Sequence, residues 1–197
     1  MRQGVWLLSL DEKTSIQARE GAYPPRPTQP GRPMLHEARS HRRAARHLFA
    51  GLSVADGKIY GTCRSRTCVV AFQTFVPQEI IPEAQRRQIQ SVIFILDHGT
   101  TPAPQPLERW LLEVEQASER LFHFQVHWLP PNASWLDQIE IWFRLLQRKH
   151  LQPNHFLRTD SLEASLREYL AYSNQTAKPI NWTDTVEKLE QKLGNHL

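Results

Sequence analysis

The run SVIFIL at residues 91–96 is the feature that most narrows what this chain can fold into. It places five consecutive apolar residues, β-branched and aromatic types among them, directly before Asp97. The run is too short for a stable helix, and continuous apolar runs of this length are typical of strands buried on both faces. The sequence therefore predicts a central strand, covered on both faces, that ends at Asp97.

A second apolar run, Val5 to Leu10, is followed in the same way by Asp11. It also predicts a short buried strand. Open α/β sheets place their ligands at the carboxyl ends of strands, so both acids are candidates for a site. The competing interpretation is that each is a turn or helix-cap residue, the usual role of a lone aspartate after a strand.

The rest of the chain alternates between strand-like and helix-like segments, apart from a basic, proline-rich insertion at 18–47. We expect a hairpin of 48–54 and 58–64 turning at Asp56-Gly57, a helix over 72–90 broken near Pro77 or Pro82, a helix at 106–119, a strand at 122–129, and helices near 135–150, 161–173 and 183–193. This order predicts a single α/β domain over residues 1–197, with a mixed sheet flanked by helices and a helical C-terminal part at 161–197.

The segment NASWLDQIEIWF at 132–143 contains two acids near the start of a predicted helix. Ser134 is a good N-cap, and Asp137, three residues later, suits a variant of the capping box. At about 100° per residue, Glu140 lies on the border of the apolar face and Asp137 lies further toward solvent. The apolar face itself comprises Trp135, Leu136, Ile139, Trp142, Phe143 and Leu146. Asp137 therefore has a local structural role, and Glu140 is the candidate for a site.

Asp11, Asp97 and Glu140 would repel one another if the fold brought them together. A pair of divalent cations relieves that repulsion, and ligands that are all oxygen favour Mg²⁺ or Mn²⁺ over zinc. Two such ions serve in-line phosphoryl transfer. The alternative is that Glu140 is simply solvated on the helix surface.

The positive charge is concentrated in the insertion. Residues 18–47 hold seven arginines against Glu20 and Glu37, whereas the whole chain has a net charge of +4. A lysine-free arginine segment suits bidentate contact with phosphate, although a solvated loop is the competing interpretation. The predicted DNA-binding residues are Arg32, Arg39, Arg42, Arg43, Arg46, Arg144, Arg148 and Lys149.

Cysteines, tryptophans and hydropathy add narrower expectations. Cys63 and Cys68 predict two reduced thiols rather than a zinc site or a disulfide, because no further pair of ligands stands at a suitable spacing. Most tryptophans are expected to pack in the core rather than stack on bases. No apolar run reaches the roughly 20 residues that span a bilayer, so we expect a cytoplasmic protein with no membrane partner.

Four blocks, taken in order, resemble one known family. They are LSLDEKTSIQA, HLFAGLSVADGKIYG, VIFILDHGTT and LPPNASWLDQIEIWFRLLQRKHL, and NQTAKPINW at 174–182 resembles the family's C-terminal segment. The chain is similar to the DDE-type catalytic domain of insertion-sequence transposases related to the mariner class. The resemblance implies a ribonuclease-H-like fold, Mg²⁺-dependent cleavage at transposon ends with Mn²⁺ as a substitute, and attack of the freed 3′-OH on target DNA. It also implies a homodimer on DNA and no small-molecule substrate.

The resemblance carries the family's three acids onto Asp11, Asp97 and Glu140, as both catalytic and metal-binding residues. The family block Asn-Gln-Val-Glu reads DQIE here, with Asp137 at its first place. His98 and Pro102 stand where the family usually has Asn and His. The family's N-terminal helix-turn-helix region is expected to be absent. The alternative functions are an inactive transposase remnant that only binds DNA or a partner subunit, and a ribonuclease-H-like nuclease of another type.

Overall fold

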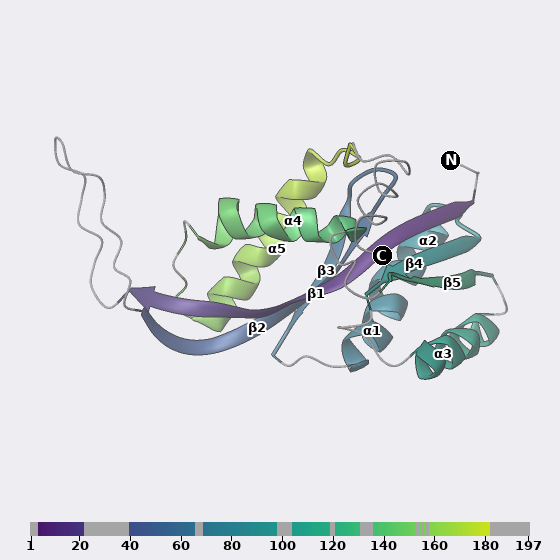
Figure 1. Cartoon of the computed structure of the whole chain (residues 1–197), viewed down its shortest axis with the longest axis horizontal. Helices are drawn as coiled ribbons and strands as arrows, with labels where there is room; N and C mark the ends of the chain where they lie inside the picture. Colours follow the sequence, from purple (N-terminus) through teal and green to yellow (C-terminus); the bar gives the residue numbers. More distant parts are fainter. Residues whose placement is uncertain are drawn as a thin grey trace, which may run out of the picture.

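A five-stranded mixed sheet forms the framework of the chain (Figure 1). The computed structural model describes residues 4–21, 40–65, 69–97, 104–118, 121–130, 136–152, 154, 156 and 158–181. The strands, in spatial order, are β3 (Ile59–Arg64), β2 (Ser40–Ser53), β1 (Val5–Gly21), β4 (Ser91–Leu96) and β5 (His123–Trp128). The first three pair antiparallel, whereas β1, β4 and β5 run parallel. This arrangement confirms the predicted mixed sheet flanked by helices.

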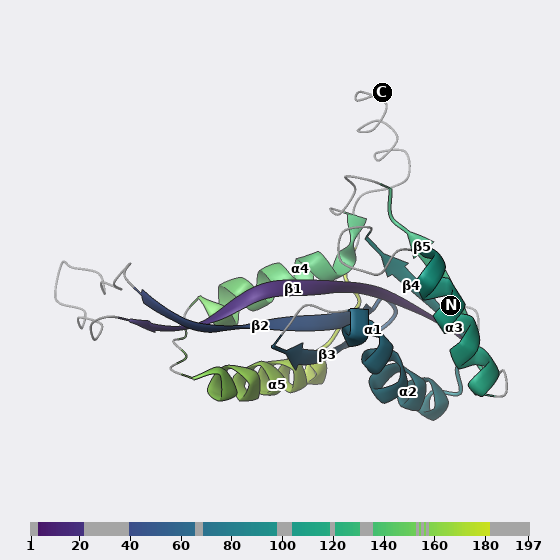
Figure 2. The same cartoon turned by 90° about the horizontal axis from the view of Figure 1, so that it is seen from below.

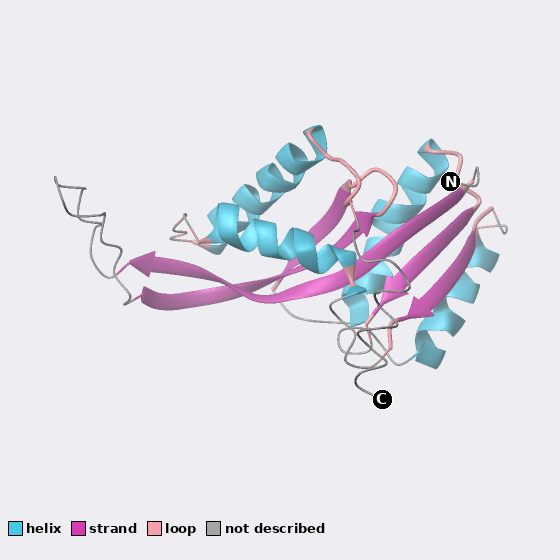
Figure 3. Cartoon of the chain, turned by 45° about the horizontal axis from the view of Figure 1, so that its top comes forward, coloured by secondary structure: helices cyan, strands magenta, loops and turns pink. Residues whose placement is uncertain are grey.

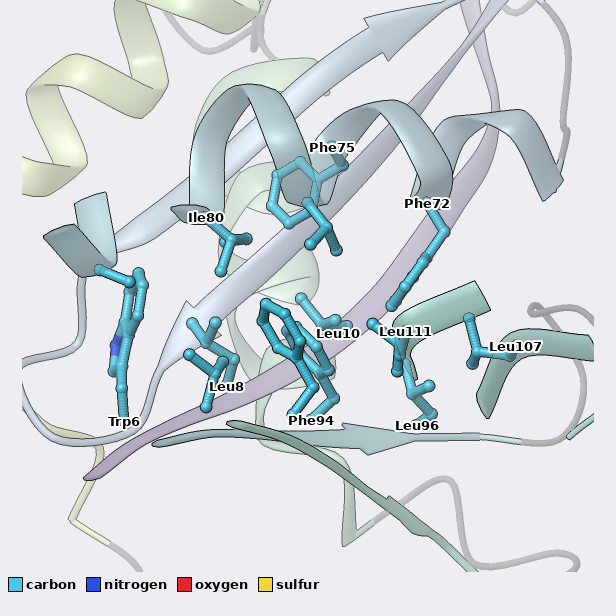
Figure 4. Packing of buried hydrophobic residues seen from close by; sticks show 14 of the residues in the cluster. Trp6, Leu8, Leu10, Phe72, Phe75, Ile80, Phe94, Leu96, Leu107 and Leu111 are labelled. Atoms are coloured by element: carbon cyan, nitrogen blue, oxygen red, sulfur yellow. The ribbon is translucent and has the colours of Figure 1, made fainter. Parts of the chain in front are cut away.

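One face of the sheet carries the larger hydrophobic core (Figure 4). Side chains alternate along β1, and Trp6, Leu8 and Leu10 all point to this face and are buried. Phe72, from the helical layer, packs on the sheet, with its ring centroid 5.5 Å from that of Phe94 in β4. The helices on this face are α1 (Val69–Phe75), α2 (Ile81–Arg86) and α3 (Pro104–Ala117).

The other face carries a second core built from α4 (Gln138–Leu146) and α5 (Thr159–Gln175). Leu48, Ala50 and Leu52 of β2 pack there against Ile139 of α4. Figure 3 shows α4 and α5 together beside the β1–β2 ribbon, while α3 lies at the opposite edge next to β5. The two faces of the sheet are therefore covered at different places along its width.

This offset corrects one expectation about β4. The strand has the predicted bounds and lies inside the sheet, but Ile93 and Ile95 are only partly buried on the α4 side. The described helices on that side cover β1 and β2 rather than β4. The continuous apolar run correctly indicated a strand, but its second face is not fully covered.

The β1–β2 ribbon corrects a second expectation. β1 runs from Val5 to Gly21 and β2 begins at Ser40, so both ends of the predicted insertion at 18–47 belong to strands. Ile16 and Ala18 are buried in the second core, and this burial holds a polar-looking segment in extended form. Register shifts between Lys13 and Ile16 and between Gln17 and Arg19 bend the ribbon, which extends beyond the other strands (Figure 2). Residues 22–39 of the insertion lie outside the described residues.

The remaining elements match the predicted pattern with small shifts. Asp56-Gly57 turns the β2–β3 hairpin, with Gly57 at φ +72°. Pro77 and Pro82 begin the π-helical turn η1 (Val76–Ile80) and α2 instead of ending a helix, because both occupy first-turn positions. A second π-helical turn, η3 (Gln147–Leu151), extends α4. The predicted helix at 183–193 lies outside the described residues.

Candidate active site

Asp11 and Asp97 meet at the centre of the sheet. The parallel strands β1 and β4 pair in register up to Leu10 and Leu96, and each acid is the next residue. Neighbouring strands lie about 5 Å apart. Leu10 and Leu96 both face the larger core, so the alternation of side chains directs Asp11 to the opposite face, which α4 covers. Asp11 is only 7% exposed there, and Asp97 is half-buried.

Glu140 approaches the same place from α4. Ile139, its neighbour, is fully buried against β2 residues that pair with Ser9 and Asp11. Glu140 lies in the first turn of α4 and is half-buried. In Figures 1 and 3 this N-terminal end of α4 lies over β1, beside the end of β4. The fold thus draws the three predicted acids to one region of one face.

The predicted exposure of Asp137 was wrong. It is 1% exposed rather than turned toward solvent, and it is itself the N-cap of α4, where Ser134 had been predicted. Its Oδ1 accepts hydrogen bonds from the Ser9 hydroxyl and from the Ile139 N–H. The helical wheel failed here because Asp137 precedes the helix, so the 100° rotation does not apply to it.

The electrostatics around Asp137 reveal how close the acids are. Burial raises the pKa of Asp137 to about 6, the hydrogen bonds from Ser9 and Ile139 lower it, and the nearby Glu140 and Asp97 carboxylates raise it further. Its Oδ2 is buried without a hydrogen-bond partner among the described residues. The site therefore concentrates negative charge in a poorly solvated place, which favours a cation.

The donors suit a hard divalent cation in kind. Asp11, Asp97 and Glu140 offer only carboxylate oxygen, the ligand type that Mg²⁺ and Mn²⁺ prefer. Across the described residues, however, no three His, Cys, Asp or Glu side chains are grouped closely enough to hold one ion. The acids therefore fit such a cation in chemistry and in the face they share, while their side chains do not converge on one point.

Two residues beside Asp11 on the α4 face escaped the sequence prediction. Ser9 and Lys13 flank Asp11 at a period of two, so all three lie on the α4 face of β1. The Lys13 Nζ lies 5.9 Å from the centroid of the Phe143 ring of α4. Strand periodicity was the available signal, but the prediction ended the strand at Leu10.

The predicted DNA-binding residues lie in three settings. Arg32 and Arg39 are outside the described residues, and Arg42 and Arg43 lie on β2, where only their backbone is described. Arg46 is 17% exposed and forms an ion pair with Glu163, which ties β2 to α5. Arg144, Arg148 and Lys149 are exposed on α4 and η3. DNA contact by these residues stays a prediction.

The cysteine and tryptophan expectations have partial outcomes. Cys63 is a free thiol whose pKa burial raises to about 11, and Cys68 lies outside the described residues. Trp142 is buried, and Trp110 and Trp128 pack against the larger core, as predicted. His98, Pro102, Trp135 and Trp182 lie outside the described residues. No described helix combines the length and apolar character needed to cross a bilayer.

The mixed sheet in the order β3-β2-β1-β4-β5, with helices on both faces, belongs to the ribonuclease-H-like class of folds. Within that class, residues 6–163 match the model of the DDE superfamily endonuclease family. The chain belongs to this family, a group of metal-dependent DNA-cutting enzymes. The expected relationship to DDE-type transposases is thereby confirmed, whereas an origin in a bacterial insertion sequence stays a prediction.

Solved structures support the same fold. The chain resembles one chain in the structure of the simian T-cell lymphotropic virus intasome in complex with the PP2A regulatory subunit B56 gamma, at 13% identity and a TM-score of 0.52, covering 94% of this chain and 52% of that one. It also resembles the Mos1 transposase in a paired-end complex with the left transposon end, at 16% identity and a TM-score of 0.52, covering 86% and 48%. The Mos1 strand transfer complex gives a TM-score of 0.51 at 16% identity, covering 86% and 47%.

The chain spans about half the length of the solved chains it resembles. No curated protein matches its sequence.

Proposed function

We propose that this chain is the catalytic part of a DNA transposase that cleaves DNA at transposon ends and joins the freed 3′-OH to target DNA. The observation that carries the proposal is the Leu10–Leu96 register pair, which sets Asp11 and Asp97 side by side under the first turn of α4. Family membership and the fold shared with the Mos1 transposase complexes support it. DNA is the partner, bound by a homodimer, and the location is cytoplasmic.

In this proposal Asp11, Asp97 and Glu140 hold Mg²⁺, with Mn²⁺ as a substitute. When bound, a pair of such ions activates the attacking oxygen and stabilises the leaving oxygen of an in-line displacement. The chain's own contribution is to hold the carboxylates on rigid elements and to limit the access of water to Asp11, which is 7% exposed. Arg144, Arg148 and Lys149 are exposed along α4 and η3 and would contact the phosphate backbone of the DNA.

Nicking of supercoiled plasmid by the purified chain with Mn²⁺ tests the proposal without knowledge of the transposon-end sequence. Glu140→Gln should abolish nicking because it removes one carboxylate charge while keeping the side chain's shape. Glu113→Gln is the matched control, since Glu113 is exposed on α3 at the other face of the sheet. A second assay follows the joining of a labelled oligonucleotide 3′-OH to the plasmid.

Three results would contradict parts of this assignment. Full nicking by Glu140→Gln would remove Glu140 from the site. Nicking without joining, together with cleavage of RNA–DNA hybrids, would favour a nuclease of another type. An inactive remnant would bind DNA but would not nick it. In that case Mn²⁺ would bind the unmodified chain and Asp97→Ala equally or not at all.

A further inference from the structure

The hydroxyl of Ser9 occupies the N-terminus of α4, although Ser9 belongs to β1. Ser9 donates to Asp137 Oδ1 and accepts from the Ile139 N–H at 3.0 Å. The Ile139 N–H reaches the helix's own cap, Asp137 Oδ1, only at 3.4 Å. The shorter hydrogen bond is the one to Ser9, which is 130 residues away in the sequence. The first turn of α4 is therefore capped largely by a side chain of β1.

Each partner in this contact is close in the sequence to one of the candidate acids. Ser9 stands two residues before Asp11 and points to the same face of β1. Asp137 stands three residues before Glu140, whose N–H donates to the Asp137 carbonyl at 3.2 Å. One short contact therefore links the strand that bears Asp11 to the helical turn that bears Glu140. Both partners are at most 1% exposed, so water does not compete for the contact.

Helix α5 begins without a side-chain cap. The N-cap of α5 is Arg158, and its side chain makes no capping hydrogen bond. A buried, charge-assisted contact between distant segments is stronger and more restrictive in geometry than an exposed cap. At α4 the contact also keeps a carboxyl group beside Asp97 and Glu140 despite their repulsion.

We propose that Ser9 and Asp137 are positioning residues that hold the Glu140-bearing turn of α4 at the Asp11–Asp97 pair. This inference rests on the proposed function of the three acids. The Ser9 hydroxyl fixes the height of α4 over β1, and Asp137 fixes the start of the helix and hence the direction of Glu140. Neither residue is a ligand in this assignment. Their loss loosens the geometry of the acids without removing any of the three carboxylates.

Ser9→Ala is the first test, read by calorimetric Mn²⁺ titration and by plasmid nicking at saturating Mn²⁺. We expect Mn²⁺ affinity to fall about tenfold, as is usual when support around a metal site is lost, and nicking to fall as well. Ser53→Ala is the matched control, because Ser53 is fully buried, accepts a 2.9 Å hydrogen bond from Trp6 Nε1 and faces the larger core. Equal effects of the two variants on Mn²⁺ affinity would overturn the proposal.

Substitutions at Asp137 separate a positioning residue from a ligand. Asp137→Asn keeps an oxygen acceptor for Ser9 and Ile139, so it should retain Mn²⁺ binding and nicking. Asp137→Ala removes the acceptor and should reduce both, as Ser9→Ala does. Loss of Mn²⁺ binding in Asp137→Asn but not in Glu140→Gln would overturn the proposal, because Asp137 would then be the third acid.

A double-mutant cycle tests the contact without any metal. The changes in urea unfolding free energy for Ser9→Ala and Asp137→Ala should be clearly non-additive, because each variant removes the same hydrogen bond. Additive changes would overturn the contact and leave the proposed function standing. Absence of Mn²⁺ binding by the unmodified chain would instead overturn the proposed function, and with it any role of the pair in a metal site.

Discussion

The two faces of β1 use the same six-residue stretch for opposite purposes. Trp6, Leu8 and Leu10 face the larger core and are at most 1% exposed. Ser9 and Asp11 alternate with them and face α4, where they are buried among polar partners and other acids. One strand can therefore belong to the core on one face and to the site on the other, because its side chains alternate with a period of two.

The largest expected effect comes from the polar face. Asp11→Asn should lower the nicking rate at least about 1000-fold, or about 4 kcal/mol of transition-state stabilisation, because it removes a charge that would hold the metal. The unfolding free energy should change little in comparison. Nicking rates and urea unfolding of the same preparation provide the measurement. If Asp11→Asn nicked DNA normally, the polar face of β1 would have no catalytic role to set against the structural role of the apolar face.

The apolar face should respond in the opposite way. Leu10→Ala should lower the unfolding free energy by about 3–4 kcal/mol, because Leu10 is fully buried and the truncation removes buried apolar contacts and leaves a cavity. Leu112→Ala, at a residue 55% exposed on α3, should change stability by less than about 0.5 kcal/mol. Urea unfolding measures both variants. A small effect at Leu10 would mean that the core on this face is loosely packed.

On the polar face, the stability of the chain should depend on pH through Asp137. Its pKa is about 6 in the folded chain against an ordinary 3.8, so between about pH 4 and 6 the folded state binds more protons than the unfolded state. Stability should therefore fall as pH rises through this window, by at most about 3 kcal/mol from this residue. Asp137→Asn should remove that part of the fall.

Urea unfolding at pH 4 and pH 7 in the presence of a chelator makes this comparison. Glu12 and Glu79 also have a raised pKa through burial, so the informative quantity is the difference between the unmodified chain and the variant. Identical pH dependence in the two proteins would show that Asp137 keeps its ordinary pKa.

The smallest expected effect lies on the outer side of α4 and η3. Arg148→Ala should weaken binding to any DNA duplex modestly and reduce the slope of log affinity against log salt by about 1, because one phosphate contact is lost. Arg109→Ala, at an exposed residue of α3, is the control. Fluorescence anisotropy across a salt series measures both slopes. Equal slopes for Arg148→Ala and the unmodified chain would exclude Arg148 from the DNA surface.

Local patterns were sufficient for much of the fold. The bounds of β4 follow from one apolar run, and the turn at Asp56-Gly57 follows from residues that tolerate positive φ. Asp11 and Asp97 could be selected as candidates because each follows an apolar run, although β1 continues past Asp11 to Gly21. Their adjacency required the parallel pairing of β1 with β4, which no local pattern specifies.

The errors have a common cause. The segment after Leu10 looked irregular because it is polar, yet β2 supplies its hydrogen bonds and the second core buries Ile16 and Ala18. Asp137 was predicted to be solvent-exposed because a helical wheel does not include the strand on which the helix packs. In both places a distant segment changed the environment of residues whose local pattern indicated another state.

Short windows of the sequence were enough to locate the start of β1 before Asp11, the strand β4 that ends before Asp97, the apolar face of α4 and, through the resemblance of the blocks, the family. Those properties depend on periodicity and residue type within short windows. The length of the β1–β2 ribbon, the burial of Asp137 and the contact of Ser9 with the start of α4 could be seen only in the three-dimensional structure. The burial of Asp137 and its contact with Ser9 depend on hydrogen bonds and desolvation between residues more than 100 positions apart. The length of the ribbon depends on the pairing of β1 with β2, which are separated in the sequence by residues 22–39.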